Sequence, residues 1–397
     1  MITVQEAEQI ILSHIKDYGI EYVPFQQALG RVLAEDLLCD RDMPAYDRIS
    51  MDGIAVRYSA IERGVTSFTI RATQAAGDAP LSIEHDEECI EIMTGGALGT
   101  STDTVVPYEH IEIKQGKALI VSTKIKQGQN IHYRGSDKRK GDVAATAGSI
   151  IDAAIINVAA TIGATLLPVK RQPRILIVST GDELVEVDET PAPWQIRRSN
   201  NYTIQAVLRQ NGLDADMMHL PDDATIMEQQ LREALGEYDV LLLSGGVSMG
   251  KYDHLPMVLK QLGVQQHFHK VQQRPGKPFW FGSHNNTLIF AFPGNPVSGF
   301  MCLHRYFLPW YYQGMGVAQK KLYAMLASDI TFAPNLQYFL QVATHMNEQA
   351  QLVATPLPGN GSGDLANLVE SNAFLELPID KTEFKAGEVY RLWVFKQ

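Results

Sequence analysis

The pattern of hydrophobic and polar positions divides the chain into regions with different periods. Residues 3–17 have apolar side chains at helical spacing, and similar spacing predicts helices over 25–33 and 151–162. Between residues 54 and 134 the pattern changes to short β-type runs separated by Gly, Asp and Pro. These runs predict an all-β region between helical segments.

A different pattern starts at Pro173. Short apolar runs that are typical of buried strands alternate with amphipathic helical stretches as far as about residue 314. This alternation predicts a parallel, doubly wound α/β sheet. From about residue 320 to the end, β-type runs with turn residues return, which predicts a small C-terminal barrel or sandwich.

Three glycine-rich loops lie within the α/β region. The apolar run 240–243 leads into SGGVSMG (244–250), and the loops PGKP (275–278) and PGNP (293–296) follow. A parallel strand that ends in a Gly/Ser loop leaves free backbone N–H groups at the carboxyl edge of its sheet, where anions bind. Three such loops, one of them with Lys277, predict a pocket for a phosphorylated small molecule.

Acidic residues follow the same strand ends. They are Asp182 and Glu183, then Asp222 and Asp223, and then Asp253 beyond SGGVSMG. Such Asp residues commonly cap helices and turns. Around a phosphate pocket, however, two carboxylates about 4 Å apart repel by about 4 kcal/mol at an effective dielectric constant near 20. A bound Mg²⁺ relieves this repulsion, so we expect a divalent metal held by some of Glu183, Asp222 and Asp253.

Three basic residues are candidates for the phosphate pocket, namely Lys270, Arg274 and Lys277. Charged side chains of this kind are also mostly exposed, so Lys270 and Arg274 are equally compatible with a solvated surface. His267 and His269 share one face of an expected strand, but no third ligand completes a zinc set. The chain has no P-loop and no dinucleotide fingerprint.

Composition narrows the class of protein. A chain of 397 residues is expected to form two to four domains, and its 45% hydrophobic and 20% charged residues are normal for a globular protein. The three widely separated cysteines indicate a reducing compartment, and neither a membrane span nor a signal peptide is predicted. A formal net charge of −11 argues against nucleic-acid binding and requires a locally basic pocket for any anion.

Six motifs occur in a fixed order along the chain. They are DRISMDGIAV (47–56), IMTG (92–95), STGDEL (179–184), SGGVSMGKYD (244–253), RPGKP (274–278) and FPGNPVS (292–298). With this set the chain resembles the molybdopterin molybdenumtransferase family, called MoeA in bacteria, which is related to the gephyrin E domain. The resemblance implies a transferase of molybdenum cofactor biosynthesis. Such an enzyme inserts molybdate into adenylylated molybdopterin, with Mg²⁺-dependent release of AMP.

The resemblance also implies a domain organisation. Four domains are expected: a discontinuous mixed helix/strand domain (1–40 and 135–172), a β-rich inserted domain (41–134), a MoaB/MogA-like α/β molybdopterin-binding domain (173–317) and a C-terminal β-barrel (318–397). The implied assembly is an elongated cytoplasmic homodimer whose active cleft lies between the α/β domain of one subunit and the β domain of the other. Transient contacts with the adenylyltransferase and with molybdoenzymes or their chaperones are implied as well.

Functional residues are carried over position by position. The implied catalytic residues are Asp52, Thr94, Asp137, Glu183, Asp222 and Asp253, of which Glu183, Asp222 and Asp253 would hold the metal. Lys270 and Ser362 are carried over as residues that bind the pterin substrate. The expected binding set is completed by residues of the glycine-rich loops, namely Gly245, Gly246, Ser248, Arg274, Lys277, Pro293 and Pro296.

The chain departs from the family pattern at three places. Arg274 stands where the family often has Lys, and HYR (132–134) stands where it usually has several Arg. The match around Ser362 is loose. Two other classes remain open: an enzyme on the same α/β core, similar to the molybdopterin adenylyltransferase or a nucleotide pyrophosphatase, and a non-catalytic scaffold.

Overall fold

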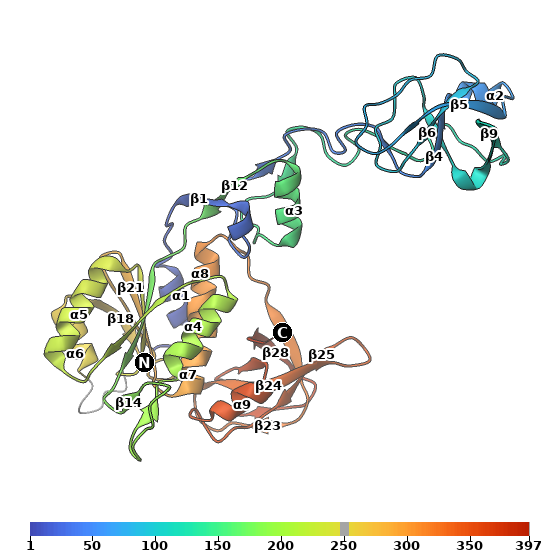
Figure 1. Ribbon diagram of the computed structural model, residues 1–397. Coiled ribbons are helices and arrows are strands. Elements are labelled where there is room, and N and C mark those ends of the chain that lie inside the picture. The colour runs from blue at the N-terminus through green and yellow to red at the C-terminus, as the bar shows by residue number, and fades with distance from the viewer. Residues whose placement is uncertain (247–253, 397) are drawn as a thin grey trace.

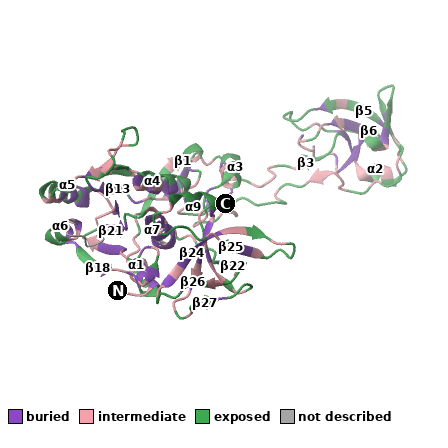
Figure 2. Cartoon of the chain, turned by 90° about the horizontal axis from the view of Figure 1, so that it is seen from below, coloured by how far each residue is buried: buried purple, intermediate pink, exposed green. Residues whose placement is uncertain are grey.

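The computed structural model describes residues 1–246 and 254–396. The molecule is elongated, with an inserted sheet at one end, an α/β unit and a β-barrel at the other, and a narrow connection between them (Figure 1). Buried residues are concentrated in the strands of these units and in the helix faces that pack on them (Figure 2). No helix in the described part of the chain is both long and apolar enough to cross a membrane.

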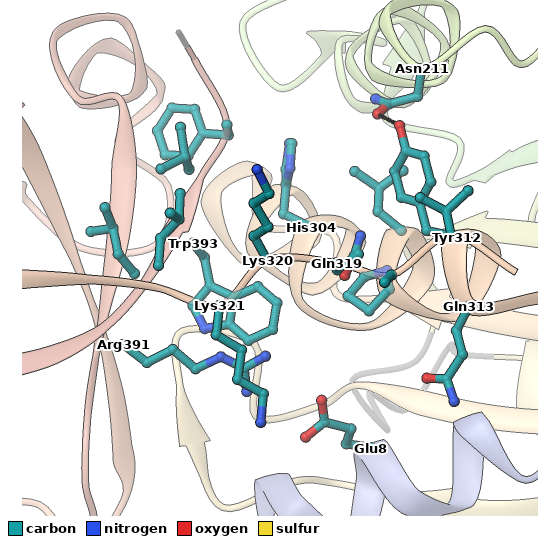
Figure 3. Close-up of a pocket in the computed structure, with 18 of the residues that line it drawn as sticks. Glu8, Asn211, His304, Tyr312, Gln313, Gln319, Lys320, Lys321, Arg391 and Trp393 are labelled. Carbon is teal, nitrogen blue, oxygen red and sulfur yellow. Dashed lines mark hydrogen bonds between the residues drawn. The ribbon is translucent and has the colours of Figure 1, made fainter. Parts of the chain in front are cut away.

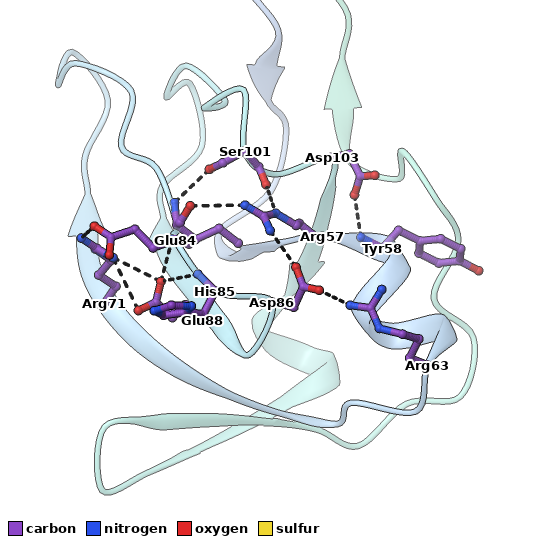
Figure 4. Close-up of polar contacts among 11 residues, drawn as sticks. Arg57, Tyr58, Arg63, Arg71, Glu84, His85, Asp86, Glu88, Ser101 and Asp103 are labelled. Carbon is purple, nitrogen blue, oxygen red and sulfur yellow. Dashed lines mark hydrogen bonds and ion pairs between the residues drawn. The ribbon is translucent and has the colours of Figure 1, made fainter.

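The inserted unit is built on a six-stranded sheet with the order β7-β4-β6-β5-β9-β8. Its loops are fixed by polar contacts, most visibly the two guanidinium groups of Arg57 and Arg63 on the carboxylate of Asp86 (Figure 4). The sheet consists of β4 (Gly53–Val56), β5 (Ser67–Gln74), β6 (Glu88–Ile92), β7 (Thr104–Pro107), β8 (Ile111–Lys114) and β9 (Lys117–Ile120).

The connecting unit contains short two-stranded pairs covered by one helix. Its elements are β1 (Ile20–Pro24) with β12 (Leu166–Lys170), β2 (Leu37–Leu38) with β11 (Val143–Ala145), and α3 (Ala153–Thr161). A further pair, β3 (Arg48–Ile49) with β10 (Ile131–His132), belongs to the inserted unit, where Ile49 and Ile131 pack on its sheet. The helix predicted over 25–33 is wrong, because only the 3-10 turn η1 (Phe25–Gln27) forms there. Gly30 has a φ of +79°, and Val32 and Leu33 form β-bridges with Ile150 and Val169.

The α/β unit confirms the predicted doubly wound sheet. The strand order is β16-β13-β17-β21-β20-β18, and the first four strands are parallel. One buried cluster packs α1, α4, α7 and α8 on one face, and a second packs α5 and α6 on the other. The strands are β13 (Ile175–Thr180), β16 (Asp216–Leu220), β17 (Val240–Ser244), β18 (Gln265–His269), β20 (Trp280–His284) and β21 (Thr287–Phe292). The helices are α1 (Val4–Leu12), α4 (Asn200–Gln210), α5 (Ala224–Glu237), α6 (Leu255–Gln261), α7 (Pro296–Cys302) and α8 (Leu308–Gly314).

The C-terminal region is a barrel rather than a sandwich. Pairing runs from β24 through β25, β22, β28 and β26 and returns to β24, so the sheet closes on itself. The two-residue strand β19 (Gln273–Arg274) leaves the α/β unit and adds parallel to β24, which places the PGKP loop against the barrel. The barrel strands are β22 (Leu322–Leu326), β24 (Gln337–Met346), β25 (Leu352–Pro356), β26 (Ala373–Leu377) and β28 (Val389–Val394).

Candidate functional site

The loops singled out in the sequence all leave one edge of the α/β sheet. Strands β13, β16, β17 and β21 are parallel, so their carboxyl ends share that edge. The PGKP loop precedes β20, which is antiparallel to β21 and therefore begins at the same edge. Lys270 follows β18, which is antiparallel to β20 and so ends there too. Chain direction alone thus gathers the glycine-rich loops and the acidic residues on one side.

Two acidic loops of this edge are joined by reciprocal hydrogen bonds. The backbone N–H of Asp222 donates to Asp182 Oδ1 at 3.0 Å, and the N–H of Asp182 donates to Asp222 Oδ2 at 3.4 Å. The carboxylate of Glu183 folds back over Gly181, where an added Cβ would lie 2.3 Å from Oε2. Asp223 caps α5 by accepting from the N–H of Thr225 and Ile226, so it has the ordinary helix-capping role.

The metal set expected from the sequence is only partly described. Asp222 and Glu183 are exposed at the shared edge and offer the oxygen ligands that Mg²⁺ prefers. Asp253 and Ser248 lie outside the described residues. Within residues 1–246 and 254–396, no group of three His, Cys, Asp or Glu side chains could hold a metal ion. The donor chemistry therefore fits Mg²⁺, but the described carboxylates do not complete a site.

The first glycine-rich loop packs tightly against its neighbours. The N–H of Gly245 donates to the carbonyl of Phe292 at 3.2 Å, which joins this loop to the end of β21. Gly246 has a φ of +69°, and an added Cβ would lie 2.9 Å from Thr180 Oγ1 and 3.2 Å from Leu255 Cβ. Glycine at position 246 is thus required by packing within the protein, a reason that the sequence did not reveal.

A cavity of about 580 Å³ lies between the α/β edge and the barrel. Four of the predicted substrate-binding residues line it: Arg274, Lys277, Pro293 and Ser362. Its volume is in the range usual for small-molecule sites. Pro296 lies at the start of α7, beside the cavity. Lys270 precedes β19 by three residues and has a φ of +72°. The structure therefore brings together predicted residues that are nearly 90 positions apart in the sequence.

The cavity has a positive electrostatic character. Arg274 and Lys277 contribute cations, and none of the lining residues that the structure describes is acidic. The guanidinium of Arg274 lies 5.7 Å from the centre of the Phe332 ring, which supports it by a cation–π contact. Burial raises the pKa of the Tyr338 hydroxyl, so Tyr338 lines the cavity in its neutral form. Such a lining suits an anionic ligand despite the negative net charge of the chain.

Sequence reasoning missed several lining residues, because they lie on barrel strands and carry no motif. Asn295 Nδ2 donates to Ser362 Oγ at 2.8 Å, and the N–H of Val297 donates to the carbonyl of Ser362. These bonds hold the barrel loop with Ser362 against the PGNP loop. Gln341 lines the same cavity and accepts from Asn367. Asn295 lies inside the PGNP motif and so had a sequence signal, whereas Gln341 had none.

A second group of predicted residues lies in the inserted unit. The backbone N–H and the hydroxyl of Thr94 both donate to Asp52 Oδ1, at 2.6 and 2.8 Å. These bonds lower the pKa of the Asp52 carboxyl. His132 Nε2 lies 2.7 Å from Asp137 Oδ1. The two pairs are linked through β3. The carbonyl of Ile49 accepts from the N–H of Gly95, which follows Thr94, and Arg48, the other residue of β3, pairs with His132.

The two groups of residues are separated within one chain. The inserted sheet with β4 and β6 lies at one end of the elongated molecule, and β14 (Leu184–Val185), which follows Glu183, lies in the α/β unit at the other (Figure 1). A single subunit therefore does not bring Asp52, Thr94 and Asp137 to the acidic edge with Asp222.

A second, larger cavity of about 1250 Å³ contains none of the predicted site residues. It lies between α1, α8, the segment 317–322 and β28, where Glu8, His304, Arg391 and Trp393 are among its lining side chains (Figure 3). Burial lowers the pKa of His304 to about 3. The location of this cavity is distinct from that of the phosphate-type loops.

Three family models together match most of the chain. The family model "MoeA N-terminal region (domain I and II)" matches residues 2–163, "Probable molybdopterin binding domain" matches 176–312, and "MoeA C-terminal region (domain IV)" matches 323–395. A protein of Synechocystis sp. named molybdopterin molybdenumtransferase is 39% identical, with 100% of both chains covered. One of the same name from Haemophilus influenzae is 29% identical, with 100% of this chain and 99% of the relative covered. A crystal structure of a molybdopterin biosynthesis MoeA protein from Pyrococcus horikoshii superposes with a TM-score of 0.83 at 26% identity, with both chains fully covered.

Proposed function

We propose that the substrate of this protein is adenylylated molybdopterin and that AMP is released in a Mg²⁺-dependent step. The chain belongs to the MoeA family of molybdopterin molybdenumtransferases and acts in molybdenum cofactor biosynthesis by molybdenum insertion. The observation that carries this proposal is the basic cavity between the α/β edge and the barrel. It is lined by Arg274 and Lys277 and by no described carboxylate, while Asp222 and Glu183 follow strand ends of the same sheet edge.

The proposed roles follow from this arrangement. Arg274 and Lys277 bind the phosphates of the substrate, and Ser362 contacts it from the barrel side. Asp222, together with Asp253, holds Mg²⁺, which when bound neutralises phosphate charge during release of AMP. Glu183 lies on a separate loop and acts near the pterin or molybdate. Asp222→Asn should then raise the Mg²⁺ concentration needed for half-maximal activity, whereas Glu183→Gln should lower turnover at saturating Mg²⁺.

We also propose that the active cleft forms between two subunits of a cytoplasmic homodimer. The separation of the Asp52 group from the acidic edge within one chain supports this arrangement (Figure 1). The four domains expected from the sequence are part of the same proposal. So are transient contacts with the enzyme that supplies the adenylylated substrate and with the molybdoenzymes or chaperones that receive the product.

One assay tests the reaction, and one tests the assembly. Purified protein is mixed with adenylylated molybdopterin, Mg²⁺ and molybdate, and molybdate-dependent release of AMP is measured. Absence of AMP release from the wild-type protein would refute the proposed substrate. For the assembly, Asp52→Ala and Asp222→Ala subunits are mixed and allowed to exchange. A composite cleft predicts that mixed dimers regain one intact site, and no recovery would place each site within one chain.

A further inference from the structure

Arg48, His132 and Asp137 form a hydrogen-bonded chain in the inserted unit. Arg48 Nη2 lies 2.9 Å from His132 Nδ1, and His132 Nε2 lies 2.7 Å from Asp137 Oδ1. The backbone creates this order, because β3 and β10 pair antiparallel with Arg48 opposite His132. Asp137 follows in the next loop, where its N–H donates to the carbonyl of Met43 at 3.0 Å. Strand pairing therefore places Arg48 beside His132, and the backbone bond to Met43 holds the loop that carries Asp137.

The chemistry of Arg48 determines which nitrogen of His132 carries the proton. A guanidinium group has donors only, so His132 Nδ1 must accept in the bond to Arg48. A ring nitrogen that accepts has no proton, so the proton of the neutral ring lies on Nε2. That N–H then donates to Asp137 Oδ1. A doubly protonated ring would lose the bond to Arg48 and would place two cations side by side.

The bonds to the Asp137 side chain converge on one oxygen. His132 donates to Oδ1 at 2.7 Å, and Ser136 Oγ lies 3.4 Å from the same atom. No residue within the described ranges 1–246 and 254–396 bonds to Oδ2. One oxygen thus fixes the orientation of the carboxylate, and the other stays available to a ligand.

We propose that His132 is a positioning residue of the molybdenum-insertion site, in which Arg48 fixes the Nε2–H tautomer and this N–H orients Asp137. The inference rests on the proposed function, because the role of Asp137 comes from it. It also explains how this chain works with His at position 132, where the family usually has Arg. The side chains of His132 and Asp137 are 33% and 55% exposed, so the effect belongs at the lower end of the range for a charge-assisted hydrogen bond.

A spectroscopic experiment tests the hydrogen-bonded chain without any assay of activity. The full chain is labelled with ¹⁵N-histidine, and two-bond ¹H–¹⁵N correlations are recorded at mildly alkaline pH. The ring of His132 is assigned by the loss of its signals in His132→Gln. A neutral ring with its proton on Nε2 is expected. A proton on Nδ1, or a doubly protonated ring, would overturn the inference even if the enzyme releases AMP.

Kinetics of AMP release test the effect on Asp137. His132→Phe keeps a ring but cannot donate, so kcat should fall about tenfold with little change in KM. The amide of Gln in His132→Gln can still donate to Asp137, so its kcat should lie at least halfway, on a logarithmic scale, between those of His132→Phe and the wild type. His345→Gln changes an exposed histidine on β24 and is the matched control.

A double-mutant cycle separates positioning from a general structural effect. If His132 acts through Asp137, adding His132→Phe to Asp137→Asn should lower kcat by less than about twofold further. A full tenfold further loss would overturn the inference, as would a His132→Phe enzyme as active as the wild type. Failure of the wild-type protein to release AMP would instead refute the proposed function, and the spectroscopic result would still decide the state of His132.

Discussion

Gly246→Ala should destabilise the α/β unit by about 2–4 kcal/mol, more than an equivalent change at another left-handed glycine. Gly246 has a φ of +69°, a conformation that costs an L-residue about 1–2 kcal/mol. The new Cβ would also lie 2.9 Å from Thr180 Oγ1 and 3.2 Å from Leu255 Cβ. Crowding of this kind adds about 1–3 kcal/mol, and loss of chain freedom in the unfolded state offsets about 0.4–1 kcal/mol.

Two other glycines of the same unit separate these contributions. Gly263 has a φ of +76° but no neighbour nearer than 3.8 Å to an added Cβ, so Gly263→Ala should cost only about 1 kcal/mol. Gly236 lies within α5 with no atom within 4 Å of an added Cβ, so Gly236→Ala should stabilise by about 0.5–1 kcal/mol.

The assay is urea unfolding followed by fluorescence of Trp280 and Trp310, which are buried within the α/β unit. Substrate affinity is measured well below the unfolding transition, so that a binding defect is not confused with loss of fold. If Gly246→Ala and Gly263→Ala unfold with equal free energies, the crowding at Thr180 is absent and the argument is refuted. Glycine at 246 would then be explained by close approach of the ligand alone.

Three further predictions concern charges. Lys277→Met should weaken binding of adenylylated molybdopterin about 3- to 10-fold and flatten its salt dependence, whereas the exposed Lys260→Met on α6 should not; equal salt dependence would remove Lys277 from the phosphate site. Arg305 is 1% exposed and pairs with Glu8 and with Glu376. Arg305→Met should lower the free energy of unfolding by about 3–5 kcal/mol, because the buried carboxylate of Glu376 loses its only cationic partner among the described residues; a loss below about 1 kcal/mol would contradict this. Burial lowers the pKa of His304 to about 3, so only the unfolded state binds a proton below about pH 6.5 and stability is lost as the pH falls. The free energy of unfolding should drop by about 3 kcal/mol between about pH 6.5 and 4 from this group, and His304→Leu should remove that part of the pH dependence.

Local patterns in the sequence were sufficient to predict the α/β class of this unit. The wholly buried runs of β13, β17 and β21 and the helical spacing of α4 and α5 predicted a doubly wound sheet, which the structure confirms. The motif set predicted the MoeA family, which the comparisons confirm. The helix predicted over 25–33 failed because apolar spacing there is equally compatible with a chain that turns at Gly30 and pairs with distant strands.

Sequence by itself determined which residues carry charge and which loops contain glycine, since these depend on residue type and on neighbours along the chain. It did not determine which of those loops meet. Strand direction put the loops on one edge, and the short pairing of β19 with β24 brought Ser362 to Arg274 and Lys277. The pairing of β3 with β10 likewise placed His132 between Arg48 and Asp137. Contacts of this kind join residues far apart in the chain, so only the tertiary structure could decide them.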